Sequence, residues 1–387
     1  MARGGDIFMM EGLTRPSVRL AMHGFGYIGK IHVMAAQLAH LAGGTSLSPV
    51  WELCVVRDEH SPSGQLASQF FSRLSTHVEE LGTAGLAGVD IVSPNYLHEP
   101  AVVAALRGKA GIYCEKPLAS SLDRATEMTR SVIAAGRLNQ VALVYRFHPA
   151  VEEALAWLKS GILGRPFTFR GVLLHGSYLN PKRPMSWRLQ SELAGAGALL
   201  DLGVHLFDLV RVLLGEVCCV QAQLRTFVAQ RGNAMGVRQA VTLDDWAQVN
   251  LQLTNGVLGS IELSRVHFGL EAAYFTIVCE RGTLRIPLDH LQPAEVHLLA
   301  PGRAPDLPDT TQGLSAYRPA KKLTEDVLLC CHTTAIAIFL HRLQGGTLAY
   351  PVPTFADALA AEQVVAAAQS SAALGRSIRM EHSPLET

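Results

Sequence analysis

The chain has 387 residues, of which 49% are hydrophobic and 17% charged, a composition that suits a globular protein of about two domains with a large core. Lysine plus arginine and aspartate plus glutamate both total 33, so the formal net charge is zero. This balance gives no reason to expect a nucleic acid or an anionic membrane as a partner, although a local basic patch is compatible with it. No apolar run reaches the roughly 18 residues of a membrane span.

The first 16 residues and the cysteines bear on location. Residues 1–16 contain no basic start followed by a long apolar run, so we expect a loose leader and no secretory signal peptide. The seven cysteines form no Cys-x-x-Cys pair, which favours reduced thiols in a cytoplasmic protein. Cys330, Cys331 and His332 are adjacent, but no second ligand pair has zinc-like spacing. We therefore interpret them as buried side chains and expect no metal.

From Val18 onward, short apolar runs alternate with helical patterns. The first run leads into a glycine-rich turn and a helix, and the later runs end in polar or proline-containing turns. This alternation predicts a doubly wound parallel sheet, a Rossmann domain over residues 17–148. The strands are expected at residues 18–22, 51–56, 89–92, 111–114 and 141–145, and the helices at 30–40, 65–73, 99–106 and 122–135.

After Pro149 strand-like stretches dominate, and residues 149–387 are expected to form an α+β domain. Residues 246–253 alternate apolar and polar side chains, as in a sheet with one wet or interface face. We predict a large open, mostly antiparallel sheet, and a proline-rich loop with short strands at 291–320. The strands are expected at 167–174, 217–227, 246–253, 257–263, 274–279 and 283–286, and the helices at 151–159, 197–214, 325–343 and 355–374.

The glycine-rich turn has the spacing of a dinucleotide-binding loop. Glycines let the backbone turn tightly and approach a pyrophosphate at a helix N-terminus. The turn follows a predicted strand and opens a predicted helix, which is the context that the motif requires, although an ordinary glycine turn has the same letters. Asp58 follows the next strand, where an acid binds ribose hydroxyls, and its neighbour Arg57 could receive the phosphate of NADP. The loop consists of Gly24, Phe25, Gly26, Tyr27, Ile28 and Gly29.

Lys116 follows another predicted strand, in the sequence Glu115-Lys116-Pro117. Ligands of open α/β sheets bind outside the carboxyl ends of the strands. A lysine there could stabilise alkoxide character while a hydride is transferred. A solvated surface lysine in a proline turn is the alternative interpretation.

Asp201 and His205 lie four residues apart, so they are expected on one face of a predicted helix. His205 could take the proton of an alcohol as a general base. Asp201 could bind substrate or orient the imidazole. An ion pair on a helix face without a catalytic role is the plain alternative.

Taken in order, these segments resemble the Gfo/Idh/MocA oxidoreductases, which include glucose-fructose oxidoreductase and inositol dehydrogenases. The resemblance covers residues 18–380. It is carried by the glycine loop with Lys30, Ile31 and His32 and by five later segments: residues 93–98, 115–118, 145–149, 187–188 and 201–205.

The resemblance implies roles for individual residues. Lys116, Asp201 and His205 would be the catalytic set, and the Lys116-Pro117 bond is often cis in this family. The cofactor would be NAD or NADP, with NAD slightly favoured, and the second domain would assemble homodimers or homotetramers through its sheet. The residues implied at the cofactor or nearby substrate are Ser93, Pro94, Asn95, His98, Glu115, Arg146, Trp187 and Arg188.

These observations predict a dehydrogenase that acts on a CH–OH group of a sugar, inositol or related polyol. One departure is visible: the family often has three glycines before the Asp-x-Gly-x-x-His motif, whereas this chain has Ala194-Gly195-Ala196-Gly197, whose methyl groups would narrow the site. Two alternatives stay open, an NAD-dependent redox-neutral glycosidase and a nucleotide-sensing regulator of the same fold. The sequence does not identify the substrate.

Overall fold

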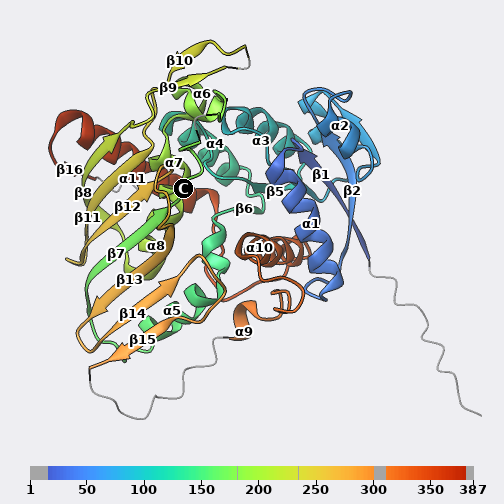
Figure 1. The fold of residues 1–387 in the computed structure, drawn as a ribbon. Helices are drawn as coiled ribbons and strands as arrows, with labels where there is room; N and C mark the ends of the chain where they lie inside the picture. Colours follow the sequence, from blue (N-terminus) through green and yellow to red (C-terminus); the bar gives the residue numbers. More distant parts are fainter. Residues whose placement is uncertain (1–15, 181, 234, 300–310, 381–387) are drawn as a thin grey trace, which may run out of the picture.

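In a computed structural model, two β-sheets and their helices form one body (Figure 1). The structure describes residues 16–380 except 181, 234 and 300–310. The expected leader at 1–16 therefore lies outside the described residues, apart from Pro16. Within the part of the chain that is described, no helix combines the length and the apolar character needed to cross a membrane.

The N-terminal sheet has six strands in the order β3-β2-β1-β4-β5-β6, and every pair is parallel. This is the strand order of a dinucleotide-binding Rossmann fold, so the predicted doubly wound parallel sheet is confirmed. Its strands β4 and β5 are buried throughout because helices cover both faces. The strands are β1 (Ser17–His23), β2 (Ser48–Val55), β3 (Arg73–Ser75), β4 (Gly88–Ile91), β5 (Gly111–Cys114) and β6 (Asn139–Val141).

Helices and 3-10 turns connect these strands, and two expected boundaries are wrong. The helix predicted at 65–73 ends at Ala67, because Arg73 already pairs with Leu53 in the sheet. The strand predicted at 141–145 stops at Val141, and a 3-10 turn follows. The connecting elements are α1 (Tyr27–Leu41), α2 (Pro62–Ala67), η1 (Val78–Gly82), η2 (Asn95–Leu97), α3 (His98–Arg107), α4 (Leu122–Ala134) and η3 (Val144–Phe147).

The C-terminal sheet has eight strands in the order β15-β14-β13-β7-β12-β11-β8-β16, and only β7 and β12 run parallel. The predicted large, mostly antiparallel sheet is thus confirmed, and the alternation in β11 places Ala247, Val249, Leu251 and Leu253 in the core. The strands are β7 (Pro166–Leu174), β8 (Val217–Arg225), β11 (Trp246–Leu253), β12 (Leu258–Ser264), β13 (Ala272–Cys279), β14 (Gly282–Pro287), β15 (Glu295–Leu298) and β16 (Ile378–Arg379). A separate hairpin joins β9 (Gln230–Gly232) and β10 (Arg238–Ala240).

The helices of the second half cover the inner face of this sheet and also reach the first domain. α10 packs against α1, although the two helices lie far apart in the sequence (Figure 1). The helix predicted at 197–214 is broken at Leu202 into α7 and α8. The elements are α5 (Pro149–Lys159), η4 (Trp187–Leu189), α6 (Ser191–Ala194), α7 (Ala198–Asp201), α8 (Gly203–Leu214), α9 (Thr311–Leu314), α10 (Val327–Leu343) and α11 (Phe355–Leu374).

Candidate active site

The glycine loop between β1 and α1 forms an open cradle. Gly24 has a φ of +94°, and a Cβ there would lie 2.9 Å from the Cα of Ser93. A Cβ on Gly26 would meet nothing within 4 Å. Gly26 caps α1 without a side-chain hydrogen bond. The first N–H groups of α1 therefore face open space, which fits a pyrophosphate.

Not every residue of the loop faces that space. Phe25 is 4% exposed and packs edge-on against Phe71 at 5.4 Å between ring centroids. Its side chain therefore belongs to the core. Tyr27, in contrast, is 70% exposed at the start of α1. Ile28 is half-buried and packs against the apolar core of this domain.

The turn after β4 carries buried polar atoms that lack partners. Ser93 Oγ and Asn95 Oδ1 are buried, and neither has a hydrogen-bond partner among the described residues. Asn95 Nδ2 donates to the carbonyl oxygens of Ala119 (3.1 Å) and Ala194 (3.3 Å), which fixes the amide. Unpaired buried polar atoms beside the cradle are what a bound nucleotide would satisfy. The residues present thus fit a dinucleotide cofactor.

His98 supports this turn from behind. Its Nδ1 lies 3.0 Å from the carbonyl oxygen of Leu118, and its Nε2 lies 2.9 Å from that of Ser93. Burial lowers the pKa of His98, while its hydrogen bonds to the backbone of Ser93 and Leu118 act in the opposite sense. His98 therefore holds the two loops together and is placed behind the cradle.

The end of β2 presents Arg57 and Asp58 to solvent. Asp58 Oδ1 accepts a hydrogen bond of 2.9 Å from the backbone N–H of His60. This bond orients one oxygen of the carboxylate towards the backbone. The charge of Arg57 has no ion-pair partner among the described residues. Both side chains are thus accessible for a ribose or its phosphate.

Lys116 lies at the end of β5, and its bond to Pro117 is cis, as the resemblance implies. Its Nζ donates to the carboxylate and to the carbonyl oxygen of Asp201, at 2.9 Å each. The other carboxylate oxygen of Asp201 accepts from Arg265 at 2.7 Å. Burial alone would raise the pKa of Asp201, but Lys116 and Arg265 hold it well below its usual range. The lysine is therefore fixed by an ionised carboxylate.

Arg265 was not predicted from the sequence. It follows β12, is 2% exposed and has no recognisable local motif. Its contact with Asp201 arises only when α7 packs beside β12 within the second domain. No signal in the sequence distinguishes it from the other arginines.

His205 lies on α8 and is 9% exposed. Its Nδ1 is buried without a partner in the described part of the chain, and the ring packs edge-on against Tyr145 at 5.1 Å. Burial and the charge of Lys116 lower the pKa of His205 to about 3. The imidazole is therefore neutral at neutral pH and able to accept a proton. It forms part of the wall of a cavity of about 470 Å³.

Glu115 belongs to a buried polar cluster behind Lys116. Its carboxylate lies 3.4 Å from His32 Nε2, and the other ring nitrogen of His32 lies 2.9 Å from Asp90. Burial alone would lower the pKa of His32, but the two carboxylates raise it to about 9. The opposite happens at Glu115, where burial is outweighed by His32, His332 and Lys116, and the pKa falls to about 2.

The same cluster is the only group of possible metal ligands in the described residues. Ligand atoms of His32, Glu115 and His332 all lie within 4.8 Å of one another. The protonated His32 lies between the carboxylates of Asp90 and Glu115 and pairs with both. The arrangement fits a cluster of groups that share protons.

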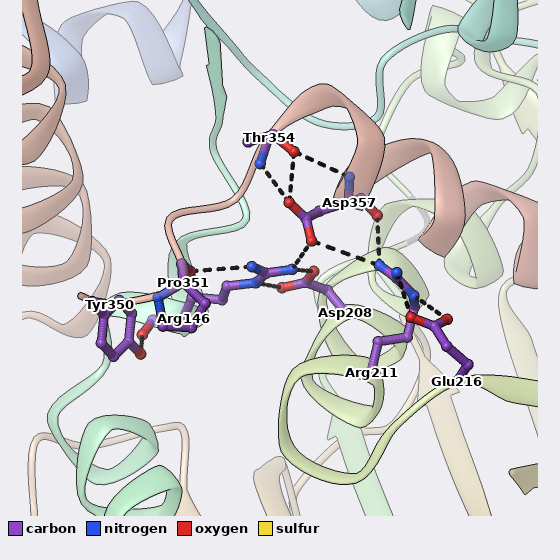
Figure 2. A network of polar contacts seen from close by, with 8 residues as sticks. All are labelled: Arg146, Asp208, Arg211, Glu216, Tyr350, Pro351, Thr354 and Asp357. Atoms are coloured by element: carbon purple, nitrogen blue, oxygen red, sulfur yellow. Dashed lines mark hydrogen bonds and ion pairs between the residues drawn. The ribbon is translucent and has the colours of Figure 1, made fainter. Parts of the chain in front are cut away.

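Arg146 does not reach the expected cofactor or substrate region. It is 3% exposed, and its guanidinium donates to Asp208 (2.7 Å for Nε) and to Asp357 (2.7 Å), as Figure 2 shows. A third partner is the carbonyl oxygen of Pro351, at 3.1 Å. These bonds engage the whole group. The expectation for Arg146 is therefore corrected: it joins η3, α8 and α11.

Trp187 and Arg188 do lie near the candidate centre. They line a small crevice together with Asn95, Asp201 and Arg265. The guanidinium of Arg188 stacks over the Trp187 ring at 4.4 Å. Methyl groups at Ala194 and Ala196 face the same crevice, so the replaced glycines narrow it. The lining also includes Pro117, whereas Pro94 only precedes the turn η2.

Two family models match the chain. The first, described as an oxidoreductase family with an NAD-binding Rossmann fold, covers residues 18–143. The second, the GFO/IDH/MocA C-terminal domain, covers residues 151–285.

Named relatives and solved structures agree with these matches. The chain is 31% identical to levoglucosan dehydrogenase from Pseudarthrobacter phenanthrenivorans over 64% of its own length and 68% of the relative's. It is 30% identical to inositol 2-dehydrogenase from Acidothermus cellulolyticus over 70% of its length and 74% of the relative's. A solved levoglucosan dehydrogenase in complex with NADH and levoglucosan superposes with a TM-score of 0.83 at 26% identity, covering 95% of this chain and 100% of the other.

Proposed function

The chain belongs to the Gfo/Idh/MocA family of NAD-binding oxidoreductases, and we propose that it oxidises or reduces a secondary alcohol of a sugar, inositol or related polyol. Relatives of this similarity are named dehydrogenases of such compounds. The redox-neutral glycosidase and the regulator are not favoured. The observation that carries the proposal is the pairing of an anchored lysine, Lys116, with a neutral, unpartnered imidazole, His205, beside the dinucleotide cradle.

The cofactor is NAD or NADP, and its nicotinamide accepts or donates the hydride when it is bound. The N–H groups at the start of α1 would hold its pyrophosphate, and Ser93 and Asn95 would pair with it through their free oxygens. Asp58 is the group for ribose hydroxyls, which favours NAD slightly, while Arg57 beside it leaves room for the phosphate of NADP.

The substrate would bind in the cavity beside His205, with its reacting hydroxyl between His205 and Lys116. His205 would take the hydroxyl proton, because its ring is neutral and has a nitrogen without a partner among the described residues. Lys116 donates a hydrogen bond to the developing alkoxide. Asp201 keeps the ammonium group aimed while Arg265 balances its charge.

Assembly and location are part of the same proposal. On the outer face of the large sheet, Leu258 and Val278 flank Thr168 and are 53% and 40% exposed. A homodimer or homotetramer through this sheet would cover them. All seven cysteines are free thiols, which agrees with a cytoplasmic location.

The test is an absorbance assay for reduced nicotinamide, with purified protein, both cofactors and a panel of inositols, aldoses and anhydrosugars. We expect one class of compound to reduce the cofactor. Lys116→Ala and His205→Ala should each lower kcat by about 10²–10⁴-fold. The exposed residues Lys159 and His77 supply matched controls, and their alanine variants should keep full activity. Release of free sugar from a glycoside without net reduction would contradict the dehydrogenase function.

A further inference from the structure

The cavity beside His205 is built from elements that are distant in the sequence and meet only in the folded chain. Its wall comes from η3, from the ends of β7 and β13 in the large sheet, and from the first turn of α10. Its volume of about 470 Å³ lies in the range of sites for small molecules. His205 lines this cavity, it is 9% exposed, and its Nδ1 has no partner among the described residues, so a polar ligand would satisfy a group that the protein leaves unpaired.

The charged groups of the cavity all have one sign. Four carboxylates line it: Glu271, Asp289, Glu325 and Asp326. No lysine or arginine is among the lining residues in the described part of the chain. The other ionisable side chains of the wall are His175, His205, Tyr145 and Cys331, and burial lowers the pKa of both histidines, so the rings are neutral at neutral pH.

The partners of these carboxylates neutralise little of the charge. Glu271 and Asp326 accept backbone N–H bonds of 2.7 Å each, which orient them without cancelling their charge. The ion pair of Asp289 with His290 is 3.5 Å long and about half exposed. The ion pair of Glu325 with Lys321 is 3.8 Å long, and its two side chains are more exposed still. Exposed pairs of this kind are weak, so the cavity carries a negative field.

Building on the dehydrogenase activity proposed above, we propose that this cavity takes a sugar or polyol that is uncharged or carries an amino group, and that it rejects uronates and sugar phosphates. Carboxylates accept hydrogen bonds from hydroxyl groups and form charge-assisted bonds with an ammonium group. A carboxylate or phosphate on the substrate, away from the reacting hydroxyl at Lys116, would meet several like charges, and no lysine or arginine stands among the lining residues in the described part of the chain to pair with it. Selection by charge therefore follows from the wall of the cavity.

The experiment compares three ligands with one ring: D-glucose, D-glucosamine and D-glucuronate. For each, kcat/KM is measured with saturating cofactor at low ionic strength, and binding is measured by calorimetry with reduced cofactor present. We expect glucosamine to equal or exceed glucose, and glucuronate to fall at least about tenfold below it. Salt at about 0.5 M should narrow the difference, because it screens exposed charges.

Variants of the lining carboxylates test whether these groups cause the difference between glucose and glucuronate. The double variant Glu271→Gln/Asp289→Asn should bring glucuronate closer to glucose, while Glu79→Gln, an exposed acid in the first domain, should change nothing. Equal or better use of glucuronate by the native protein would overturn the charge selection and leave the dehydrogenase function intact. Binding of the amino and neutral sugars without turnover would overturn the dehydrogenase function and leave the selection intact. Binding of none of the three would contradict both.

Discussion

Glu362 makes the stability of this protein depend on pH in a direction that is unusual for a carboxylate. It lies on α11 and is 5% exposed, and its Oε1 accepts a bond of 2.6 Å from the backbone N–H of Leu118, two residues after Lys116. Burial raises the pKa of Glu362 from 4.5 to about 8, although its bonds to the backbone of Leu118 and Ala119 act in the opposite sense. The folded protein thus keeps this carboxyl protonated at pH values where the unfolded chain does not.

The sign and size follow from proton linkage. Between pH 4.5 and about 8 the folded state binds one proton more at Glu362 than the unfolded state, so the free energy of unfolding falls as pH rises. The slope is about 1.4 kcal/mol per pH unit, which amounts to about 4–5 kcal/mol across the interval. Below pH 4.5 and above about 8 this group contributes no slope.

The substitution Glu362→Gln removes the titration and keeps a carbonyl oxygen for the N–H of Leu118. Urea unfolding of both proteins should be followed at pH values from about 4 to 9, and the difference between the two curves isolates this residue from every other titrating group. We expect the variant to gain stability over the native protein steadily with rising pH and to level off near pH 8.

The exposed acid Glu127 on α4 supplies the matched control, since Glu127→Gln should shift no slope. A difference curve that stays flat from pH 4.5 to 8 would refute the reasoning, because Glu362 would then ionise alike in both states. A variant that becomes less stable with rising pH would show that the ionised carboxylate is the form that holds the loop of Lys116.

Substitutions at three further places test the packing and the cradle. Asp208→Ala leaves Arg146 buried and short of a partner, and should lower the free energy of unfolding by about 3–5 kcal/mol, while Arg146→Met/Asp208→Leu should recover most of that loss in the same denaturation assay. Gly24→Ala, at a φ of +94°, should cost roughly 1–3 kcal/mol of stability, whereas Gly26→Ala, at a φ of −78°, should keep stability and weaken NADH binding, as read by fluorescence titration. Asp58→Ala should raise the Kd for NAD with little change for NADP, and an equal rise for both cofactors would speak against its role at the ribose.

Much of the fold could be predicted because many of its helices and strands are indicated by the local sequence alone. The strand at Gly111–Cys114 and the helix at Phe355–Leu374 lie where the sequence predicts them, since clear breakers bound them: Pro117 follows the strand, and Pro353 and Gly375 flank the helix. The errors at 65–73 and 141–145 have a different origin. β3 is a strand only because it pairs with β2 at the sheet edge, and a continuous apolar run such as 141–145 is compatible with a strand or with a buried turn.

The candidate site was predictable in so far as its residues belong to segments with a recognisable pattern. Lys116 and His205 are in such segments, and both reach the candidate centre. Arg265 and His332 stand in no motif, and tertiary packing alone brings them to Asp201 and Glu115. Arg146 was placed wrongly for a related reason. It stands in a motif, but the motif does not reveal that the fold brings the carboxylates of Asp208 and Asp357 to it.

The relation between Asp201 and His205 in the structure differs from the one that their spacing in the sequence predicts. One continuous helix would place both on one face, with the carboxylate free to orient the imidazole. The break at Leu202 separates them, and both oxygens of Asp201 are taken by Lys116 and Arg265. An imidazole bonded to that carboxylate would have its pKa raised, whereas His205 stays neutral with a free nitrogen at the cavity. The break therefore divides two tasks between neighbouring residues: one fixes the cation, and the other remains free to accept a proton.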